Sequence, residues 1–229
     1  VRAEGQGEWG IGLGQVARLQ ENGGNGGSGP GRKAIKTKPA QVAESRPDLV
    51  KRQFSASRPN ELWVGDITYV RTISGFVYTA FVTDVFSRKI VGWATRSTMK
   101  TEALPLEALE QAIMNAKEHL SGLVHHSDHG SQYTSITYND KLAHWGIKPA
   151  TGRVGDSYDN ALAEAVNGLY KAELIYSHPW VSLTEVEFAT MNWVHWWNNE
   201  RLHEALGYRT PADIIDMYNQ TRVSELTPV

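Results

Sequence analysis

Three acidic residues have types and positions suited to holding divalent metal ions. Asp66 lies inside a stretch rich in β-formers, Asp128 directly follows a short apolar stretch, and Glu164 lies in a helical pattern. Hard cations such as Mg²⁺ and Mn²⁺ prefer oxygen ligands of this kind. Two such ions about 4 Å apart can activate an attacking oxygen and stabilise a leaving one. Each acid alone is also an ordinary strand, turn or surface residue, but the combination favours an oxygen-rich pocket for phosphodiester chemistry.

The helical pattern around Glu164 determines which way its polar residues face. Leu162, Val166 and Leu169 mark the buried stripe of the expected helix. Glu164 is about 200° around the helix axis from Leu162, so we expect its carboxylate to face away from the core. Lys171 follows Glu164 by seven residues and returns to nearly the same face. Judged by this pattern alone, Lys171 is an ordinary lysine on a solvated face.

Other polar residues are weaker candidates. Arg201 and His203 lie near the last core helix, and either contact DNA phosphate or pack structurally. His125, His126 and His129 cannot all converge on one metal ion, because adjacent residues of a strand point to opposite faces. We therefore interpret the three histidines as structural or pocket-rim residues.

Short apolar runs and helical periodicities predict the elements that must position these residues. Three strands separated by turns form a meander, and helices then alternate with two shorter strands, which indicates an α/β fold with a mixed five-stranded sheet. Ser182 and Glu185 form a capping-box pattern at the start of the last core helix. The expected strands are 62–70, 76–85, 89–95, 122–126 and 147–150, and the expected helices begin near residues 104, 134, 159 and 183.

Several side chains have predicted packing roles within these elements. The apolar face of the first helix is expected to extend as far as Leu120. Trp193, Trp196 and Trp197 follow helical spacing and are expected in the core rather than as platforms for bases. Asp84 is expected to end a strand and to shape the turn that follows it.

The charge of the 229-residue chain is divided between a basic N-terminal part and an acidic body. Residues 1–59 carry a net charge of +5 and residues 60–229 carry −7, which together give the −2 of the whole chain. Residues 22–31 consist of Gly, Asn, Ser and Pro and predict a flexible linker. The basic residues after this linker either contact the DNA backbone or form a solvated linker. They include Arg32, Lys33, Lys36 and Lys38.

The composition excludes several classes of protein and of site. The chain contains no cysteine, which excludes disulfides, thiol nucleophiles and Cys-ligated zinc, and fits a reducing cytosol. No run approaches the roughly 20 apolar residues of a membrane span. We expect neither a secretory signal nor a membrane partner.

Five ordered motifs carry a specific resemblance, and thirty-five residues lie between Asp128 and Glu164. With that spacing the chain resembles an insertion-sequence transposase with a retroviral-integrase-type D-D-E core, of the kind made as the second-frame product of two-frame elements. The resemblance covers roughly Arg58 to Ile215. The motifs are WVGDITYV (63–70), DVFSRKIVGW (84–93), HSDHGSQY (126–133), GDSYDNALAE (155–164) and NNERLHEALGYRTP (198–211).

The resemblance implies a ribonuclease-H-like fold and a metal-dependent DNA transposase. Asp66, Asp128 and Glu164 map onto the family's metal-binding acids, with two Mg²⁺ ions as cofactors and Mn²⁺ as a substitute. The implied chemistry is attack on phosphodiesters by water and then by a freed 3′-hydroxyl, without a covalent protein–DNA intermediate. Lys171 matches a basic residue that follows the family's Glu and holds terminal DNA phosphates.

The resemblance also implies partners, a location and domain boundaries. The partners are the terminal repeats of the element, target DNA and further copies of the chain in a DNA synapse. The location is the bacterial cytoplasm, with action at the nucleoid. We expect an N-terminal arm over residues 1–58 that resembles a degenerate pre-catalytic segment, a catalytic core over 59–220 and a tail over 221–229.

Three hypotheses about function follow from these observations. The first is a transposase core that integrates and recombines DNA. The alternative is a truncated or non-catalytic remnant that binds DNA or inhibits the intact enzyme. This alternative arises because the Gly-rich N-terminal sequence differs from that of the family. The third is a two-carboxylate enzyme acting on sugars, which leaves Glu164 and Lys171 unexplained.

Overall fold

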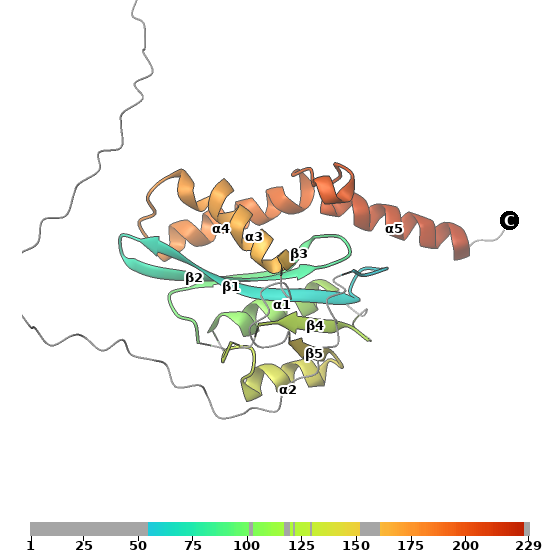
Figure 1. Cartoon of the computed structure of the whole chain (residues 1–229), viewed down its shortest axis with the longest axis horizontal. Helices are drawn as coiled ribbons and strands as arrows, with labels where there is room; N and C mark the ends of the chain where they lie inside the picture. Colours follow the sequence, from blue (N-terminus) through green and yellow to red (C-terminus); the bar gives the residue numbers. More distant parts are fainter. Residues whose placement is uncertain are drawn as a thin grey trace, which may run out of the picture. The chain divides into compact units, whose positions relative to one another are not determined.

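The computed structural model describes residues 55–100, 103–116, 120, 122–128, 130–151 and 161–226 (Figure 1). Several predictions lie outside these ranges. They concern the linker at 22–31, the basic residues Arg32, Lys33, Lys36 and Lys38, His129, and the start of the helix expected from residue 159.

A five-stranded mixed sheet with the strand order β3-β2-β1-β4-β5 is the core element of the described chain, as predicted. Strands β1 (Leu62–Thr72), β2 (Gly75–Asp84) and β3 (Ile90–Arg96) form an antiparallel meander. Strands β4 (Val124–Ser127) and β5 (Lys148–Thr151) add to it in parallel with β1. Strand β4 begins two residues later than expected, and β1 extends two residues further.

Helices cover both faces of this sheet (Figure 1). Helices α1 (Pro105–Ala116) and α2 (Ile136–His144) share one hydrophobic cluster with Ala80 and Val82 of β2. Helices α3 (Ala161–Glu173) and α4 (Leu183–Asn199) share another with Phe81 of the same strand. Because neighbouring residues of a strand point to opposite faces, the two clusters lie on opposite sides of the sheet. This arrangement confirms the predicted α/β class.

Three further helices lie in the second half of the described chain. The short 3₁₀ helices η3 (Ile175–Ser177) and η4 (Glu204–Leu206) precede α4 and α5, respectively. Helix α5 (Pro211–Leu226) packs against α4 and was not among the elements expected from the sequence. Its side chains are mostly exposed, so it lacks an apolar stripe that periodicity would reveal. The expected core boundary at residue 220 lies inside this helix.

The predicted packing roles are mostly confirmed. Trp193 and Trp197 are buried in the cluster of α3 and α4, and Trp196 packs against it partly exposed. One prediction is wrong. Leu120 is buried in the cluster of α1 but lies outside the helix, which ends at Ala116. Burial alone therefore does not show that a residue continues the helical face.

Local hydrogen bonds hold the turn and the helix start that the sequence predicts. The Asp84 carboxylate at the end of β2 accepts hydrogen bonds from the Ser87 backbone N–H at 2.9 Å and from its hydroxyl at 2.6 Å. The Ser182 hydroxyl oxygen accepts a hydrogen bond from the Glu185 N–H at 3.4 Å. These contacts confirm the expected roles of Asp84 in the β2–β3 turn and of Ser182 as the N-cap of α4.

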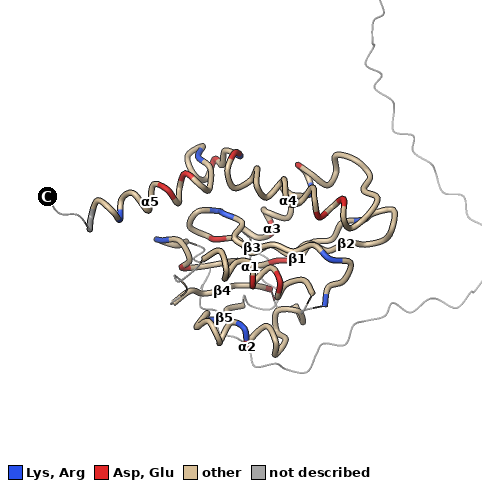
Figure 2. The backbone as a smooth tube through the Cα atoms, turned by 180° about the vertical axis from the view of Figure 1, so that it is seen from behind, with Lys and Arg blue, Asp and Glu red and all other residues tan. Residues whose placement is uncertain are grey.

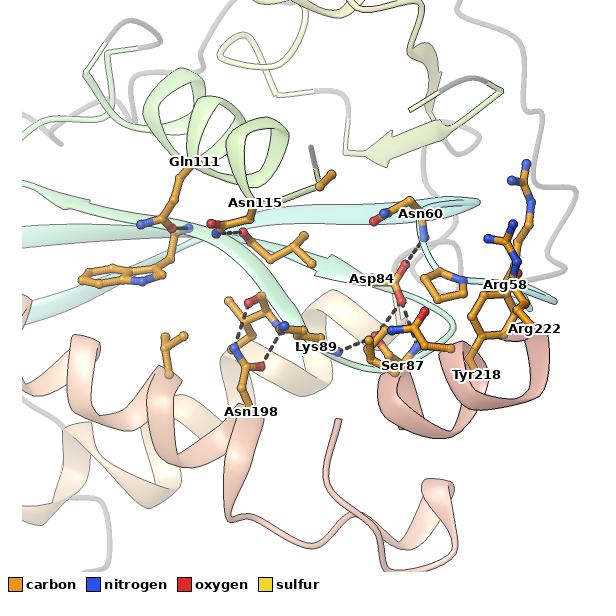
Figure 3. Close-up of a pocket in the computed structure, with 18 residues that line it drawn as sticks. Arg58, Asn60, Asp84, Ser87, Lys89, Gln111, Asn115, Asn198, Tyr218 and Arg222 are labelled. Atoms are coloured by element: carbon orange, nitrogen blue, oxygen red, sulfur yellow. Dashed lines mark hydrogen bonds between the residues drawn. The ribbon is translucent and has the colours of Figure 1, made fainter. Parts of the chain in front are cut away.

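Side-chain amides cover the backbone of β3, which is one of the two edge strands of the sheet. Asn198 of α4 accepts from the Ile90 N–H and donates to the Ile90 carbonyl, both at 2.9 Å. From α1, Gln111 accepts from the Trp93 N–H at 2.7 Å and Asn115 donates to the Val91 carbonyl at 2.9 Å. Figure 3 shows Gln111 and Asn115 on α1 and Asn198 on α4 among the residues that line a cavity of about 620 Å³. These amides bind backbone N–H and carbonyl groups of β3. On an uncovered edge strand, the same groups would be free to pair with another chain.

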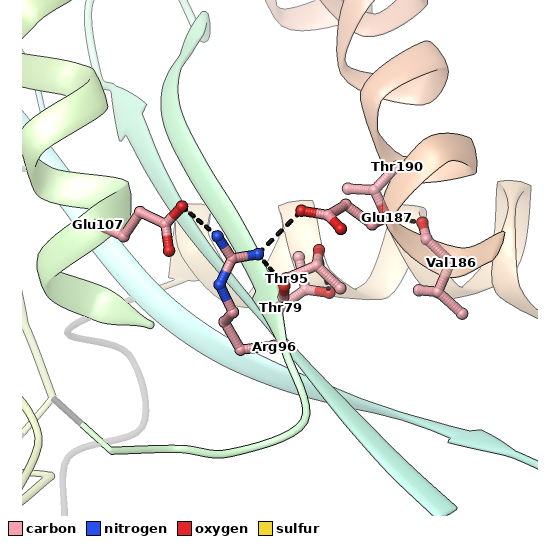
Figure 4. Close-up of polar contacts among 7 residues, drawn as sticks. All are labelled: Thr79, Thr95, Arg96, Glu107, Val186, Glu187 and Thr190. Carbon is pink, nitrogen blue, oxygen red and sulfur yellow. Dashed lines mark hydrogen bonds and ion pairs between the residues drawn. The ribbon is translucent and has the colours of Figure 1, made fainter. Parts of the chain in front are cut away.

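An arginine on the same strand joins the two helices that flank it. Arg96 forms ion pairs with Glu187 of α4 at 2.8 Å and with Glu107 of α1, and it also donates to the Thr95 carbonyl (Figure 4). All three charged side chains are about one-third exposed or more, so solvent screens the pairs. They align the helices more than they stabilise the fold.

We expect Asn198→Ala to lower the free energy of unfolding by about 2–3 kcal/mol, because two buried hydrogen bonds to Ile90 are lost and the Ile90 N–H and carbonyl lose their partners. Urea unfolding followed by circular dichroism measures this change. The matched control is Asn199→Ala, whose amide is exposed and bonds to the His195 carbonyl of its own helix. It should shift stability by no more than about 0.5 kcal/mol. Equal losses of stability in the two variants would contradict a stabilising contact of Asn198 with the backbone of β3.

Candidate active site

The register of two parallel strands brings the two aspartates side by side. Gly65 of β1 is paired with Ser127 of β4, and these are the last paired residues of the two strands. Asp66 and Asp128 directly follow them, and neighbouring strands lie about 4.8 Å apart. The two aspartates therefore lie at the same place in the sheet, where β4 ends and β1 continues.

The Asp66 carboxylate is held by hydrogen bonds from two elements. Its Oδ1 accepts from the Ile67 N–H at 2.8 Å, and its Oδ2 accepts from the Asn167 side-chain amide at 2.8 Å. Asn167 is buried on α3, three residues after Glu164. This contact joins residues 101 positions apart and attaches the helix that carries Glu164 to the strand that carries Asp66.

Asp128 and Glu164 are both exposed, unlike the half-buried Asp66. The Asp128 carboxylate accepts a hydrogen bond from the Gly130 N–H at 2.9 Å, which is typical of an Asx turn. Glu164 lies in the first turn of α3 and, as predicted, faces away from the core. Two solvent-accessible acids thus accompany one partly buried acid.

The electrostatics of Asp66 show that both other acids act on it. Burial, together with the carboxylates of Asp128 and Glu164, raises the pKa of Asp66 to about 6, against the lowering effect of the hydrogen bonds from Ile67 and Asn167. Burial raises the pKa of Tyr133 well above its usual range, and Asp66 and Asp128 add to that rise. The three acids predicted from the sequence are therefore brought into one electrostatic environment.

The donor set fits a hard divalent cation, but the carboxylates are not arranged as ligands of one ion. Among the residues that the structure describes, no group of three or more His, Cys, Asp or Glu side chains is close enough to hold a metal ion. Like charges repel one another in the absence of a cation, and the raised pKa of Asp66 reflects that repulsion together with burial. A bound cation would offset this repulsion between the carboxylates.

Asn167 is a site residue that the sequence interpretation missed. Its amide donates to Asp66, and its Oδ1 is buried with no hydrogen-bond partner among the residues that the structure describes. The available signal was its position three residues after Glu164, on a neighbouring part of the helix surface. A buried amide beside a candidate metal ligand is typical of a residue that orients the ligand.

Lys171 lies in the last turn of α3 and is half-buried. Its ammonium group is 4.7 Å from the centroid of the Tyr69 ring on β1. Its predicted contact with DNA phosphate is not tested by this geometry and stays a prediction.

Arg201 and His203 have partners within the protein. The Arg201 guanidinium donates to Glu173 Oε1 at 2.7 and 3.0 Å and lies 4.8 Å from the Trp197 ring centroid. His203 is buried against the same tryptophan, with its Nε2 3.3 Å from the Trp197 carbonyl oxygen, and burial lowers its pKa. These contacts match the packing alternative for both residues, and a DNA contact by either stays a prediction.

The buried histidines of β4 are structural, as expected. His125 and His126 are both almost fully buried, and His125 Nε2 is 2.7 Å from the Tyr138 hydroxyl of α2. A Cβ atom at Gly65 would lie 2.9 Å from the His125 ring. Glycine at position 65 therefore allows the ring to pack against β1 directly beside Asp66.

Comparisons with known families cover most of the described chain. The family described as "Integrase core domain" matches residues 56–157 and again residues 145–211, and these ranges include all three acids. A protein of Mycobacterium tuberculosis described as a transposase for the insertion sequence element IS986/IS6110 is 48% identical over 213 residues, which cover 90% of this chain and 76% of that protein.

The chain belongs to the insertion-sequence transposases with an integrase core domain. The transposase of element IS629 from Shigella sonnei is 49% identical over 203 residues, covering 89% of this chain and 67% of that protein. Identity of this extent makes the chain a transposase catalytic core that acts in DNA transposition, and it favours this function over that of a remnant.

Solved structures show the same fold at low sequence identity. The HTLV-2 integrase catalytic core domain in complex with magnesium has a TM-score of 0.53 and 17% identity, covering 70% of this transposase and 99% of that chain. A chain of the simian T-cell lymphotropic virus intasome has a TM-score of 0.55 and 20% identity, covering 69% of this transposase and 54% of that chain. The ribonuclease-H-like fold is thereby confirmed. Within the described part of the transposase, no helix is both long and apolar enough to span a bilayer.

Proposed function

We propose that Asp66, Asp128 and Glu164 hold divalent cations and carry out cleavage and strand transfer of DNA by this transposase. The observation that carries the proposal is the pairing of Gly65 with Ser127, which puts Asp66 and Asp128 side by side. The hydrogen bond from Asn167 to Asp66 then adds the helix of Glu164 to the same place. The raised pKa of Asp66 supports it, because both other carboxylates contribute to the rise.

Two Mg²⁺ ions, or Mn²⁺ in their place, would neutralise phosphate charge and polarise the attacking and leaving oxygens. The protein's own residues hold the donor set in position. Asp66 is fixed by the Ile67 N–H and by Asn167, whereas Asp128 and Glu164 are accessible to solvent and therefore to DNA. Transfer at phosphorus depends on positioning and charge neutralisation more than on a protein nucleophile, so no covalent protein–DNA intermediate is needed.

The DNA contacts belong to the same proposal. Lys171 lies two helical turns beyond Glu164 and would bind a terminal phosphate. The basic residues of the N-terminal part, Arg32, Lys33, Lys36 and Lys38, would contact the DNA backbone. In the described body, Asp and Glu residues are interspersed with Lys and Arg along the sheet and the helices (Figure 2). Such a surface attracts DNA weakly, which supports a synapse of several copies that share the DNA. Action in the bacterial cytoplasm, at the nucleoid, follows from a chromosomal DNA target.

A strand-joining assay tests this function. The full chain is incubated with precleaved ends of its element and a target plasmid, in Mg²⁺, in Mn²⁺ or in EDTA. We expect joined products in both metals and none in EDTA. The positive control is a full-length relative such as the IS629 transposase, tested on its own ends. Failure of joining in both metals while the relative works, or joining that persists in EDTA, would overturn the proposal.

A further inference from the structure

Two large aromatic side chains lie exposed on the β1–β2 hairpin. Tyr69 of β1 is 58% exposed and Phe76 of β2 is 52% exposed. Their rings meet edge to face, with centroids 5.9 Å apart and an interplanar angle of 78°. Neither ring belongs to a hydrophobic cluster that the described residues form. Burial of apolar surface within the described part of the chain thus gives no reason for two aromatic rings here.

The strand register gives this surface a positive charge. Arg71 is paired with Phe76, and Tyr69 precedes Arg71 by two residues, so all three side chains lie on the same face of the hairpin. Arg71 is exposed. Residues 67–78 contain no Asp or Glu. We call Tyr69, Arg71 and Phe76 the hairpin platform.

Lys171 links the hairpin platform to the candidate active site. Its ammonium group stands 4.7 Å from the Tyr69 ring centroid, and Glu164 lies two turns earlier on the same face of α3. Strand β4 pairs with β1 only as far as Gly65, so α3 can reach Tyr69 over the edge of β1 that β4 leaves uncovered. Along β1, Tyr69 is about 10 Å from Asp66, and the two side chains point to opposite faces of the strand. The path from the hairpin platform to the acids therefore runs around this open edge, where Lys171 lies.

The two cations of this surface have no ion-pair partner among the described side chains. No salt bridge within the described ranges involves Arg71 or Lys171. Exposed aromatic rings flanked by cations are the combination that binds single-stranded nucleic acid, because bases stack on the rings and phosphates pair with the cations. Two rings offer far less area than the roughly 1,000 Å² of a stable protein interface, which favours a nucleotide over a second copy.

We propose that the hairpin platform and Lys171 bind an unpaired nucleotide at the end of a DNA strand beside the catalytic acids. The base stacks on the face of one of the two rings and contacts the edge of the other, and the flanking phosphates lie at Arg71 and Lys171. This inference rests on the proposed function, because it supplies the DNA end on which the acids act. A stacked base would hold the strand end open and direct its terminal phosphodiester toward Asp66.

Fluorescence anisotropy of the full chain tests the platform without requiring catalysis. The probes are a blunt duplex, the same duplex with an unpaired thymidine tail, and that tail with abasic sites in place of the bases, all in Ca²⁺. We expect Tyr69→Leu and Phe76→Leu each to weaken binding of the tailed duplex about tenfold, with the blunt and abasic probes unchanged. Tyr69→Trp should restore tight binding, because the stacking ring is retained.

The control variant is Tyr176→Leu, which removes an aromatic side chain that is 75% exposed on η3. It should bind every probe like the wild type. The proposal is overturned if Tyr69→Leu weakens all probes equally, if it weakens none, or if its only effect is a change of oligomeric state in sedimentation. Strand joining by wild type that survives in EDTA would instead refute the metal site, since the anisotropy measurements stand without it.

Discussion

Asp66→Asn will lower strand joining by this transposase at least about 10³-fold and will at the same time stabilise the fold at neutral pH. The loss of activity follows from removing one of three charges that hold the cations, in a site where charge neutralisation supplies most of the catalysis. Joining assays in Mg²⁺ and Mn²⁺ measure it. The gain in stability follows from the raised pKa of Asp66, which burial and the two neighbouring acids produce.

The direction of the pH effect follows from proton binding. The pKa of Asp66 rises from 3.8 to about 6 on folding, so between these values the folded chain binds more protons than the unfolded chain. The contribution of Asp66 to stability is therefore present below pH 3.8 and is lost as the pH rises through 6. At pH 7.5 the ionised carboxylate lowers the free energy of unfolding by about 1–3 kcal/mol. Asparagine carries no charge and does not impose this cost.

Thermal unfolding at pH 7.5 and at pH 4 distinguishes these contributions. Asp66→Asn should raise Tm at pH 7.5 and change it little at pH 4. Added Mg²⁺ should raise the Tm of the wild type but not that of the variant, because a ligand that binds only the folded state stabilises it. Asp216→Asn, an exposed acid on α5, is the matched control and should change neither activity nor Tm. Full activity of Asp66→Asn would refute the site assignment.

Gly92→Ala will destabilise the fold by about 3 kcal/mol or more. Gly92 lies in β3 where α1 packs directly on the strand, and a Cβ atom there would lie 2.0 Å from the Ala108 carbonyl oxygen and 2.7 Å from the Ala112 N. Both are backbone atoms of α1, so relief requires moving the helix. A domain of this size is stable by only about 5–15 kcal/mol, so the variant should unfold at a much lower urea concentration.

Gly168→Ala should have the opposite effect on stability in the same urea unfolding experiment. Gly168 is exposed on α3, and a Cβ atom there would contact nothing within 4 Å. Alanine in a helix interior is favoured over glycine by about 0.5–1 kcal/mol, so this variant should unfold at a slightly higher urea concentration. Similar midpoints for the two variants would contradict the close packing of α1 on β3.

The sequence alone determined the five strands, the core helices and the types of the three candidate metal ligands, but not helix α5 or Asn167. Local patterns were sufficient for the meander, for the turn that Asp84 holds and for the N-cap of α4 by Ser182, because these depend on neighbours in the chain. Helical spacing also predicted that Glu164 faces away from the core. The same spacing wrongly extended α1 to Leu120, since apolar periodicity reports burial and not the end of hydrogen bonding.

The tertiary structure decided which of these residues meet. The contact of Asn167 with Asp66 joins positions 101 residues apart, and it depends on the rotation of α3 over β1. Arg201, expected as either a DNA contact or a packing residue, is paired with Glu173 of that helix.

The hairpin platform depends on the pairing of β1 with β2 and on the reach of Lys171 across an open strand edge. No local pattern encodes such contacts, because they arise from the register of strands and the docking of helices. The chain thus specified by itself which groups could do chemistry, and only folding brought them close enough to act on one another.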